Sequence, residues 1–132
     1  METNFEFKTP GQPEKIYFEQ VYAEKPGGGV VANPTIDLPP TTPVAFDSEK
    51  EQFVALVTYN STTGKYEAKT TTTGSGETAK TTIDKPDYVT GAWVYAGKGD
   101  QLVRLVNGAN LRKENAVITN DQAALIPTIK LV

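Results

Sequence analysis

The chain lacks cysteine and histidine entirely, and it has only one tryptophan and one methionine among 132 residues. Without cysteine there are no disulfides, thiolate nucleophiles or cysteine metal sites. Without histidine the Ser-His-Asp and Cys-His catalytic arrangements and ordinary zinc sites are excluded. Carboxylate pairs remain for acid–base chemistry, but the acidic residues lie in turn-like segments where charges are usually solvated. We therefore predict no enzyme activity, no catalytic residues, no cofactor and no metal site.

Positive charge and long apolar runs are also scarce. The chain has 13 Lys and Arg against 16 Asp and Glu, a formal net charge of -3. No basic patch stands out, so nucleic acid is not expected as a partner. No run approaches the roughly 20 apolar residues of a membrane span. The mixed, acidic start of the chain does not resemble a signal peptide, so no membrane partner is expected either.

Proline and glycine, by contrast, are concentrated at the start of the chain. Seven of the nine prolines fall within residues 1–43, together with three consecutive glycines. Proline removes hydrogen-bond donors from a sheet, and glycine raises the entropy cost of order. Residues 1–43 are therefore predicted to be an extended arm that forms no core of its own. Its hinge is predicted at Gly27, Gly28 and Gly29.

This arm nevertheless carries apolar and aromatic side chains. Residues 14–22 are predicted to form one strand with apolar side chains on both faces, so we expect the strand to add to another sheet or lie against another chain. A passive linker would contain few aromatic residues, which favours docking over simple disorder. The predicted docking residues are Phe5, Phe7, Ile16, Tyr17, Phe18, Val21 and Tyr22.

Residues 44–132 show the residue pattern of a compact β domain. Residues 52–59 alternate in polarity, and the Thr-rich stretch of about 60–85 predicts an inserted, solvated hairpin. Residues 87–96 are predicted to be the central core strand. Its single tryptophan, Trp93, is expected in the core rather than on a ligand platform.

The C-terminal part predicts a turn, a short helix and a last strand. Asn107-Gly108 is a strong two-residue turn sequence between two strands. Residues 119–122 offer N-cap chemistry for a short helix, and residues 128–132 predict a terminal strand. The predicted fold is mainly β, a small β-rich mixed domain with one short helix, preceded by the extended arm.

Several segments occur in an order that resembles a known family, the lambda-type phage head decoration (capsid cement) proteins. The resemblance covers residues 26–132 apart from the longer Thr-rich stretch, and the arm before Pro26 matches poorly. The segments that carry it are residues 26–28 (PGG), 42–47 (TPVAFD), 53–55 (FVA), 91–96 (GAWVYA), 105–112 (LVNGANLR) and 123–132, which end in IKLV.

The resemblance implies a structural role in the virion. A homotrimer would sit on the outer surface of the icosahedral capsid, after synthesis in the host cytoplasm. Each arm would run onto the major capsid protein and add a strand to one of its sheets, which is β-augmentation. Binding of this kind would stabilise the expanded shell.

Two other classes of function stay open from the sequence. One is another phage structural protein, such as a tail-tube or head-completion protein, because these also use extended arms; six or twelve subunits rather than three would favour it. The other is an extracellular β domain that binds a glycan or a host protein. Exposed aromatic side chains on the domain rather than on the arm would favour that class.

Overall fold

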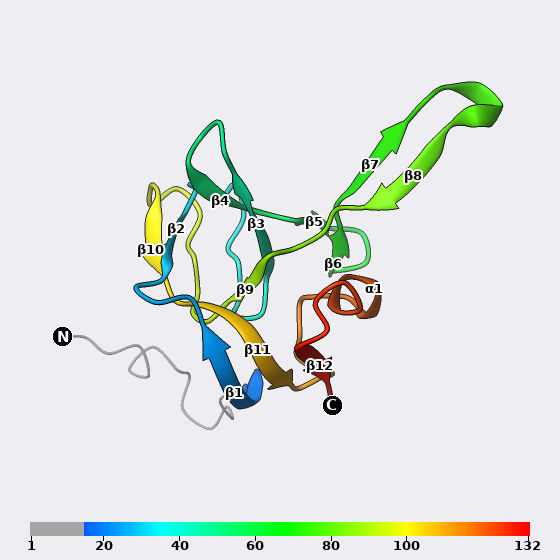
Figure 1. Cartoon of the computed structure of the whole chain (residues 1–132). Helices are drawn as coiled ribbons and strands as arrows, with labels where there is room; N and C mark the ends of the chain where they lie inside the picture. Colours follow the sequence, from blue (N-terminus) through cyan, green and yellow to red (C-terminus); the bar gives the residue numbers. More distant parts are fainter. Residues whose placement is uncertain (1–14) are drawn as a thin grey trace.

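The computed structural model describes residues 15–132, so the predicted docking residues Phe5 and Phe7 lie outside the described part. Within it, the chain folds as a mainly β structure with one short α-helix (Figure 1). This confirms the predicted fold class. The described residues form one large curled sheet, from which two small hairpins branch.

The large sheet has the strand order β1-β11-β9-β3-β4-β2-β10, and β12 pairs with β11 beside this path. The β2–β4 and β11–β12 pairs are parallel, and the remaining pairs are antiparallel. Its strands are β1 (Phe18–Glu24), β2 (Gly29–Val31), β3 (Pro43–Asp47), β4 (Gln52–Ala55), β9 (Tyr88–Thr90), β10 (Gln101–Val103), β11 (Leu105–Leu111) and β12 (Ile129–Leu131).

Two clusters of buried apolar side chains form the core. The first cluster lies around Val31, Leu38, Phe53 and Leu105, and the second lies where β11 meets β12 and the helix. Val31 and Leu38 are almost fully buried, although both belong to the predicted arm. The boundary predicted at residue 43 is therefore wrong, because the described residues from Phe18 onward already belong to the compact body.

The proline-rich segment enters the core because its remaining backbone N–H and carbonyl groups find hydrogen-bond partners. Leu38 and Val94 exchange both backbone hydrogen bonds, at 2.8 and 2.9 Å. The Thr41 N–H donates to the Thr90 carbonyl at 2.8 Å, and the Thr42 hydroxyl donates to the Pro39 carbonyl at 2.7 Å. A buried backbone must satisfy its polar groups, and these threonines do so.

Strand β1 pairs with a strand of its own chain, β11, rather than with a strand of another chain. It runs antiparallel to β11, from Phe18 opposite Leu111 to Glu24 opposite Val106, with irregularities in the register. Phe18 and Val21 pack against the second core cluster. The prediction that this strand needs a foreign sheet is corrected, because β11 offers an edge and an apolar face within the same chain.

The three consecutive glycines form a fixed turn, not the predicted hinge. Gly27 and Gly28 have positive φ angles of 76° and 69°, and the Gly28 N–H donates to the Lys25 carbonyl at 3.0 Å. A Cβ on Gly29 would lie 2.6 Å from the Leu105 side chain and 2.7 Å from the Phe53 ring. Glycine is required here for turn geometry and close packing, so the segment is not free to swing.

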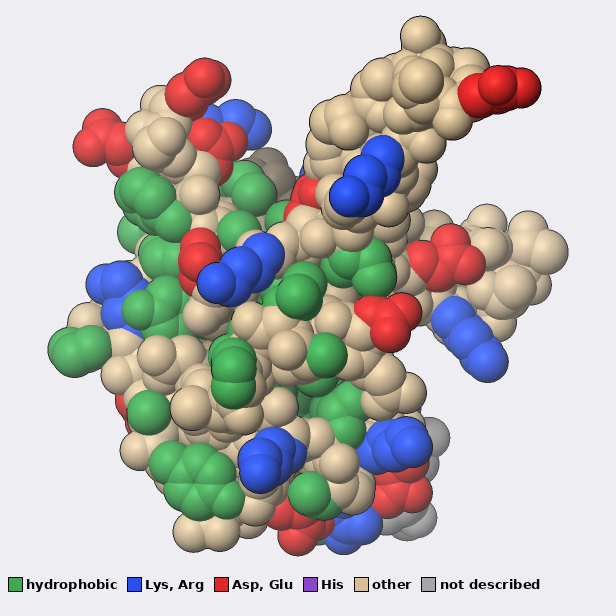
Figure 2. Space-filling view, turned by 45° about the vertical axis from the view of Figure 1, so that its right-hand side comes forward, with side chains coloured by type: hydrophobic (Ala, Val, Ile, Leu, Met, Phe, Trp, Pro, Cys, Tyr) green, Lys and Arg blue, Asp and Glu red, His purple; other side chains and the backbone are tan. Residues whose placement is uncertain are grey.

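Two separate hairpins leave the large sheet. The first joins β5 (Val57–Asn60) to β6 (Lys65–Ala68), and the second joins β7 (Thr70–Thr73) to β8 (Lys80–Ile83) around a 3₁₀ turn at Gly76–Thr78. The second hairpin projects away from the body (Figure 1). In Figure 2 it stands out as an arm of mostly uncharged polar atoms. The predicted Thr-rich hairpin is therefore present as β7–β8. The stretch predicted to form one hairpin, about residues 60–85, also contains part of the first hairpin.

Two predictions in the second half of the chain are wrong. The expected strand over residues 87–96 ends at Thr90, and beyond it Val94 forms an isolated β-bridge with Leu38, outside the strands of the sheet. Asn107 and Gly108 lie inside β11 rather than in a turn. A Cβ on Gly108 would sit 3.0 Å from the Cβ of Ala23, so this glycine allows β1 to approach closely.

The short helix and the terminal strand predicted over residues 119–132 are confirmed. Helix α1 (Asn120–Ala123) begins at Thr119, whose hydroxyl accepts the Gln122 backbone N–H, while the Gln122 side chain accepts the Thr119 N–H. This reciprocal capping box satisfies two of the free donors at the helix start. Strand β12 follows and lies parallel to β11, from Ala109 opposite Ile129 to Leu111 opposite Leu131.

Candidate docking surface

Strand β1 is the last strand at one side of the large sheet. One of its edges pairs with β11, and no strand of residues 15–132 pairs with its other edge. Residues 1–14 precede this strand in the sequence, separated from it by residues 15–17. An unpaired strand edge presents backbone donors and acceptors to any further strand, so this is the place where the sheet can be extended.

A shallow depression lies over strands β1 and β11 and the C-terminal segment. It has a volume of about 530 Å³ and is lined by side chains of β1, β11 and the C-terminal segment, among them Tyr22, Asn110, Lys130 and Val132. Tyr22 and Val132 are 57% and 58% exposed. The depression therefore offers two accessible apolar groups, and one of them, Tyr22, belongs to the strand with the open edge.

Two ion pairs tie β1 to β11. Arg104 donates two hydrogen bonds to the Glu24 carboxylate, at 2.8 and 3.0 Å, and Arg112 pairs with Glu19. The bond from Arg104 lowers the pKa of Glu24, and the same bond raises the pKa of Arg104. Both pairs are well exposed, so each adds little stability and mainly fixes the strand in place.

The predicted docking residues that the structure describes are either exposed or partly buried. Ile16 and Tyr22 are exposed and free to contact a partner, whereas Phe18 and Val21 are partly buried against their own core. Tyr17 is partly buried as well, and burial raises the pKa of its hydroxyl. Of the five predicted docking residues that the structure describes, two therefore lie on an accessible surface.

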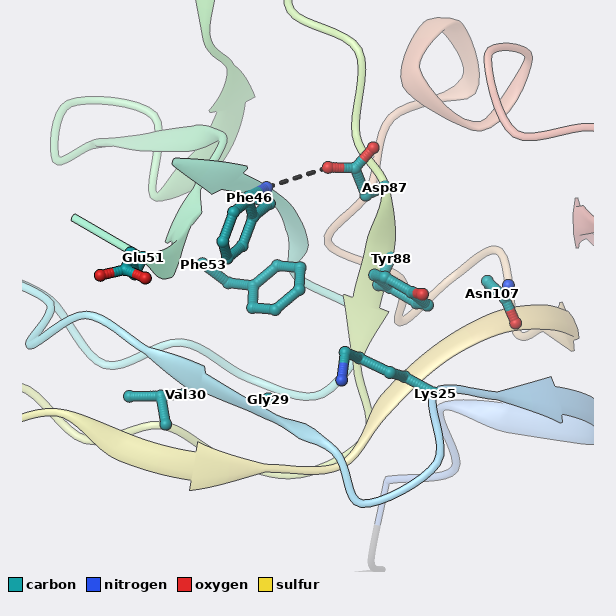
Figure 3. A pocket seen from close by; sticks show the side chains of 9 residues that line it. All are labelled: Lys25, Gly29, Val30, Phe46, Glu51, Phe53, Asp87, Tyr88 and Asn107. Carbon is teal, nitrogen blue, oxygen red and sulfur yellow. Dashed lines mark hydrogen bonds between the residues drawn. The ribbon is translucent and has the colours of Figure 1, made fainter. Parts of the chain in front are cut away.

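A second concave surface, the aromatic groove, was not predicted from the sequence. It lies between β2, β3, β4 and β9 and has a volume of about 580 Å³ (Figure 3). The rings of Phe46 and Tyr88 flank that of Phe53 in edge-to-face contacts, with centroids 5.3 and 5.7 Å from it. Phe46 is 51% exposed although it belongs to a central strand.

Charged groups surround the aromatic groove. Lys25, Glu51 and Asp87 line it, and none of them forms an ion pair with another described residue. One Asp87 oxygen accepts the Phe46 N–H at 2.9 Å, which orients the carboxylate at the rim. An apolar floor with a few polar groups is typical of a binding groove. The only hint in the sequence is that Phe46 and Phe53 flank a short charged turn.

Two other kinds of feature are absent from the described part of the chain. No group of three or more metal-ligating side chains lies together within residues 15–132. None of the helices described is long and apolar enough to cross a membrane.

Comparisons with known proteins return no match. No protein family, no characterised protein and no solved structure is significantly similar to the chain. A functional assignment therefore depends on the residues and the geometry alone.

Proposed function

We propose that this chain is a capsid decoration protein that binds the outer surface of an icosahedral phage head as a homotrimer. In this proposal residues 1–14 contact the major capsid protein and add a strand to one of its sheets. The proposal combines the order of segments in the sequence with one structural observation, the open edge of β1.

The open edge of β1 supports the proposal because residues 1–14, which precede this strand in the sequence, have a strand-like pattern. Residues 1–14 contain Phe5 and Phe7, which alternate with polar residues and so suit one face of a strand. They precede β1, whose outer edge has no strand partner among the described residues. A docking segment attached there continues the protein's own sheet toward its partner, with the exposed Ile16 and Tyr22 beside it.

The length of the segment fits contact with a neighbouring subunit. Fourteen residues reach at most about 50 Å when fully extended. A body of this size has a radius of gyration of roughly 13 Å. The segment would therefore reach well past the edge of its own body, although much less far than the 43-residue arm predicted from the sequence.

Three segments on one trimer would act together. Ordering 14 residues costs on the order of 14–28 kcal/mol, which the burial of Phe5 and Phe7 does not offset alone. One segment is therefore expected to bind weakly. Joining three of them raises the overall affinity by about 10²–10⁴. Because the trimer would bind the expanded shell and not its separated parts, it would stabilise the shell by linkage.

The proposal is tested by removing residues 1–14 and measuring co-sedimentation with empty expanded heads. The shortened protein is expected to keep its fold and to lose capsid binding. Full-length Phe5→Ser/Phe7→Ser is expected to behave likewise, whereas the matched control Thr3→Ser/Thr9→Ser binds normally. Normal occupancy by the shortened protein would overturn the proposal.

The subunit number separates the related structural roles. Sedimentation equilibrium is expected to give three subunits. Six or twelve would instead indicate a tail or neck protein, and a single subunit that never binds heads would remove the virion role altogether.

A further inference from the structure

Two aromatic side chains stand together on the surface, away from the strand edge discussed above. Trp93 and Tyr95 are 42% and 43% exposed, and their rings are nearly parallel, with an interplanar angle of 9° and centroids 6.1 Å apart. Val94 between them is fully buried. The chain is anchored by the middle side chain, so its two neighbours point away from the core.

Hydrogen bonds at residues 94–96 hold the loop that carries Trp93 and Tyr95. The Gln101 side chain accepts the Tyr95 N–H at 3.1 Å and donates to the Tyr95 carbonyl at 2.9 Å. The Ala96 N–H donates to the Asp37 carboxylate at 2.8 Å, and Val94 is fixed by its two backbone bonds to Leu38.

Hydrogen bonds also hold the end of the loop, at Gly99 and Asp100. Asp100 accepts the Asn33 N–H at 2.9 Å and the Gln52 side chain at 2.5 Å, while the Asn33 side chain accepts the Gly99 N–H at 3.2 Å. Exposed aromatic rings usually cost solvation free energy. A loop with this many specific bonds presents them in one orientation, which lowers the entropy cost of binding a ligand.

The size and charge of the surface restrict the ligand. The exposed parts of the two rings amount to no more than roughly 200 Å². A stable protein interface needs about 800 Å² on each partner, so the ring pair is too small for one. Bases also stack on aromatic rings, but a nucleic-acid site needs a basic groove, and here Asp37 and Asp100 lie beside the loop in a chain of net charge -3.

We propose that Trp93 and Tyr95 form a binding platform for a neutral carbohydrate. One face of a pyranose ring carries C–H groups with partial positive charge, which pack on the negative face of an aromatic ring. Two neighbouring rings can hold consecutive sugars of a short chain. Asp37, which accepts the N–H of Ala96 next to Tyr95, adds a carboxylate group that suits a hydrogen bond to a sugar hydroxyl.

The site is independent of the capsid proposal, because it uses neither residues 1–14 nor the β1 edge. On a particle, many copies of a weak carbohydrate site would act together. The site would then bring the particle to a polysaccharide-coated surface.

The first experiment screens the full-length protein on an array of neutral oligosaccharides that includes cellohexaose and chitohexaose. Trp93→Ala and Tyr95→Ala are each expected to weaken binding about tenfold, and the double variant to abolish it. Tyr59→Ala is the matched control, because Tyr59 is a similarly exposed tyrosine in another hairpin. It is expected to bind as well as the unchanged protein.

The second experiment uses the fact that Trp93 is the only tryptophan. A sugar that stacks on it is expected to change the intrinsic fluorescence during titration of the intact protein, with a weaker apparent affinity in Tyr95→Ala. Absence of any array binding, binding that survives the double variant, or a fluorescence response to a proline-rich peptide or single-stranded DNA but to no sugar would each overturn the proposal.

Discussion

The large sheet and the β7–β8 hairpin are both made of β-strands, but they are held by different forces. In the sheet, the residues that decide the fold are buried: Val44, Val89, Leu105 and Leu111 have no exposed surface. In the hairpin, every residue except Ile83 is exposed. The comparison shows that strand formation in this chain does not by itself indicate a core.

The hairpin depends on local bonds instead. Its register is regular over four residue pairs, from Thr70 opposite Ile83 to Thr73 opposite Lys80. The Thr72 and Thr81 hydroxyls hydrogen-bond across the strands at 2.8 Å, and the Thr71 hydroxyl donates to Asp84 at 2.5 Å. Such pairs contribute a fraction of a kcal/mol each, so a two-stranded ribbon of this kind is marginally stable by itself.

The largest expected loss of folding stability comes from a cavity opened in the core of the sheet. Leu105→Ala is expected to lower the free energy of unfolding by about 3 kcal/mol, because Leu105 is completely buried in the first core cluster. Leu102→Ala is the matched control in the neighbouring strand, where the side chain is 73% exposed, and is expected to change little. Urea denaturation of both variants measures the difference; equal effects would contradict the assigned burial.

The next largest loss of stability is expected from substitutions in the glycine turn, and it tests whether this turn belongs to the rigid sheet. Gly29→Ala is expected to cost about 2 kcal/mol, because the new methyl group would collide with Leu105 and Phe53. Gly27→Ala, where there is open space but φ is positive, is expected to cost about 1 kcal/mol. If Gly29→Ala proved neutral or stabilising by thermal denaturation, these glycines would be a flexible hinge after all.

A smaller effect concerns the loop that carries Trp93. The Asn33 N–H, and then the Gln52 amide, hold the pKa of Asp100 below its ordinary value of 3.8. The stabilisation from this carboxylate is therefore complete above pH 3.8 and is lost as the pH falls through the lower, folded-state pKa. Acid titration of Trp93 fluorescence is expected to show a transition below pH 3.8. Asp100→Asn is expected to remove that transition.

The smallest expected effect comes from removing the hairpin. The Asp84 N–H donates to the Lys69 carbonyl at 3.1 Å, so a tight turn can join these two residues directly. Replacing residues 70–83 with such a turn is expected to shift the melting temperature by no more than about 2 °C, because no core residue is lost. A larger loss in calorimetry would mean that the hairpin supports the sheet.

Local chemistry predicted the parts of the fold that depend on nearby residues. The Thr-rich hairpin, the cap of α1 and the terminal strand are all set by neighbours in sequence. The mainly β class also followed from the alternation of polar and apolar residues. These features do not require knowledge of what lies across the sheet.

Long-range contacts decided the features that the sequence did not reveal. Gly108 permits the approach of Ala23, which lies far away in the chain, so the same Asn-Gly pair that usually makes a turn lies within a strand. Leu38 and Val31 are buried because Val94 and Phe53 cover them, despite the surrounding prolines. The exposure of Trp93 and Phe46 likewise depends on where distant strands end.

The docking surface was predicted only in part for the same reason. Alternation identified an apolar strand near the start of the chain, and a strand does form there. Which of its side chains remain available depends on β11, which covers Phe18 and Val21 and leaves Tyr22 open. The aromatic groove combines β2, β3, β4 and β9, an arrangement that no short motif encodes.

The three partners of β11 also have a consequence for biosynthesis. This strand receives β1 from the start of the chain, β9 from its middle and β12 from its end, and Phe18 lies more than 90 positions from its opposite residue Leu111. Contacts this distant form slowly, since a long loop must close first. Strand β1 therefore stays without its partner until the ribosome has synthesised β11, so the large sheet forms only after most of the described residues have left the ribosome.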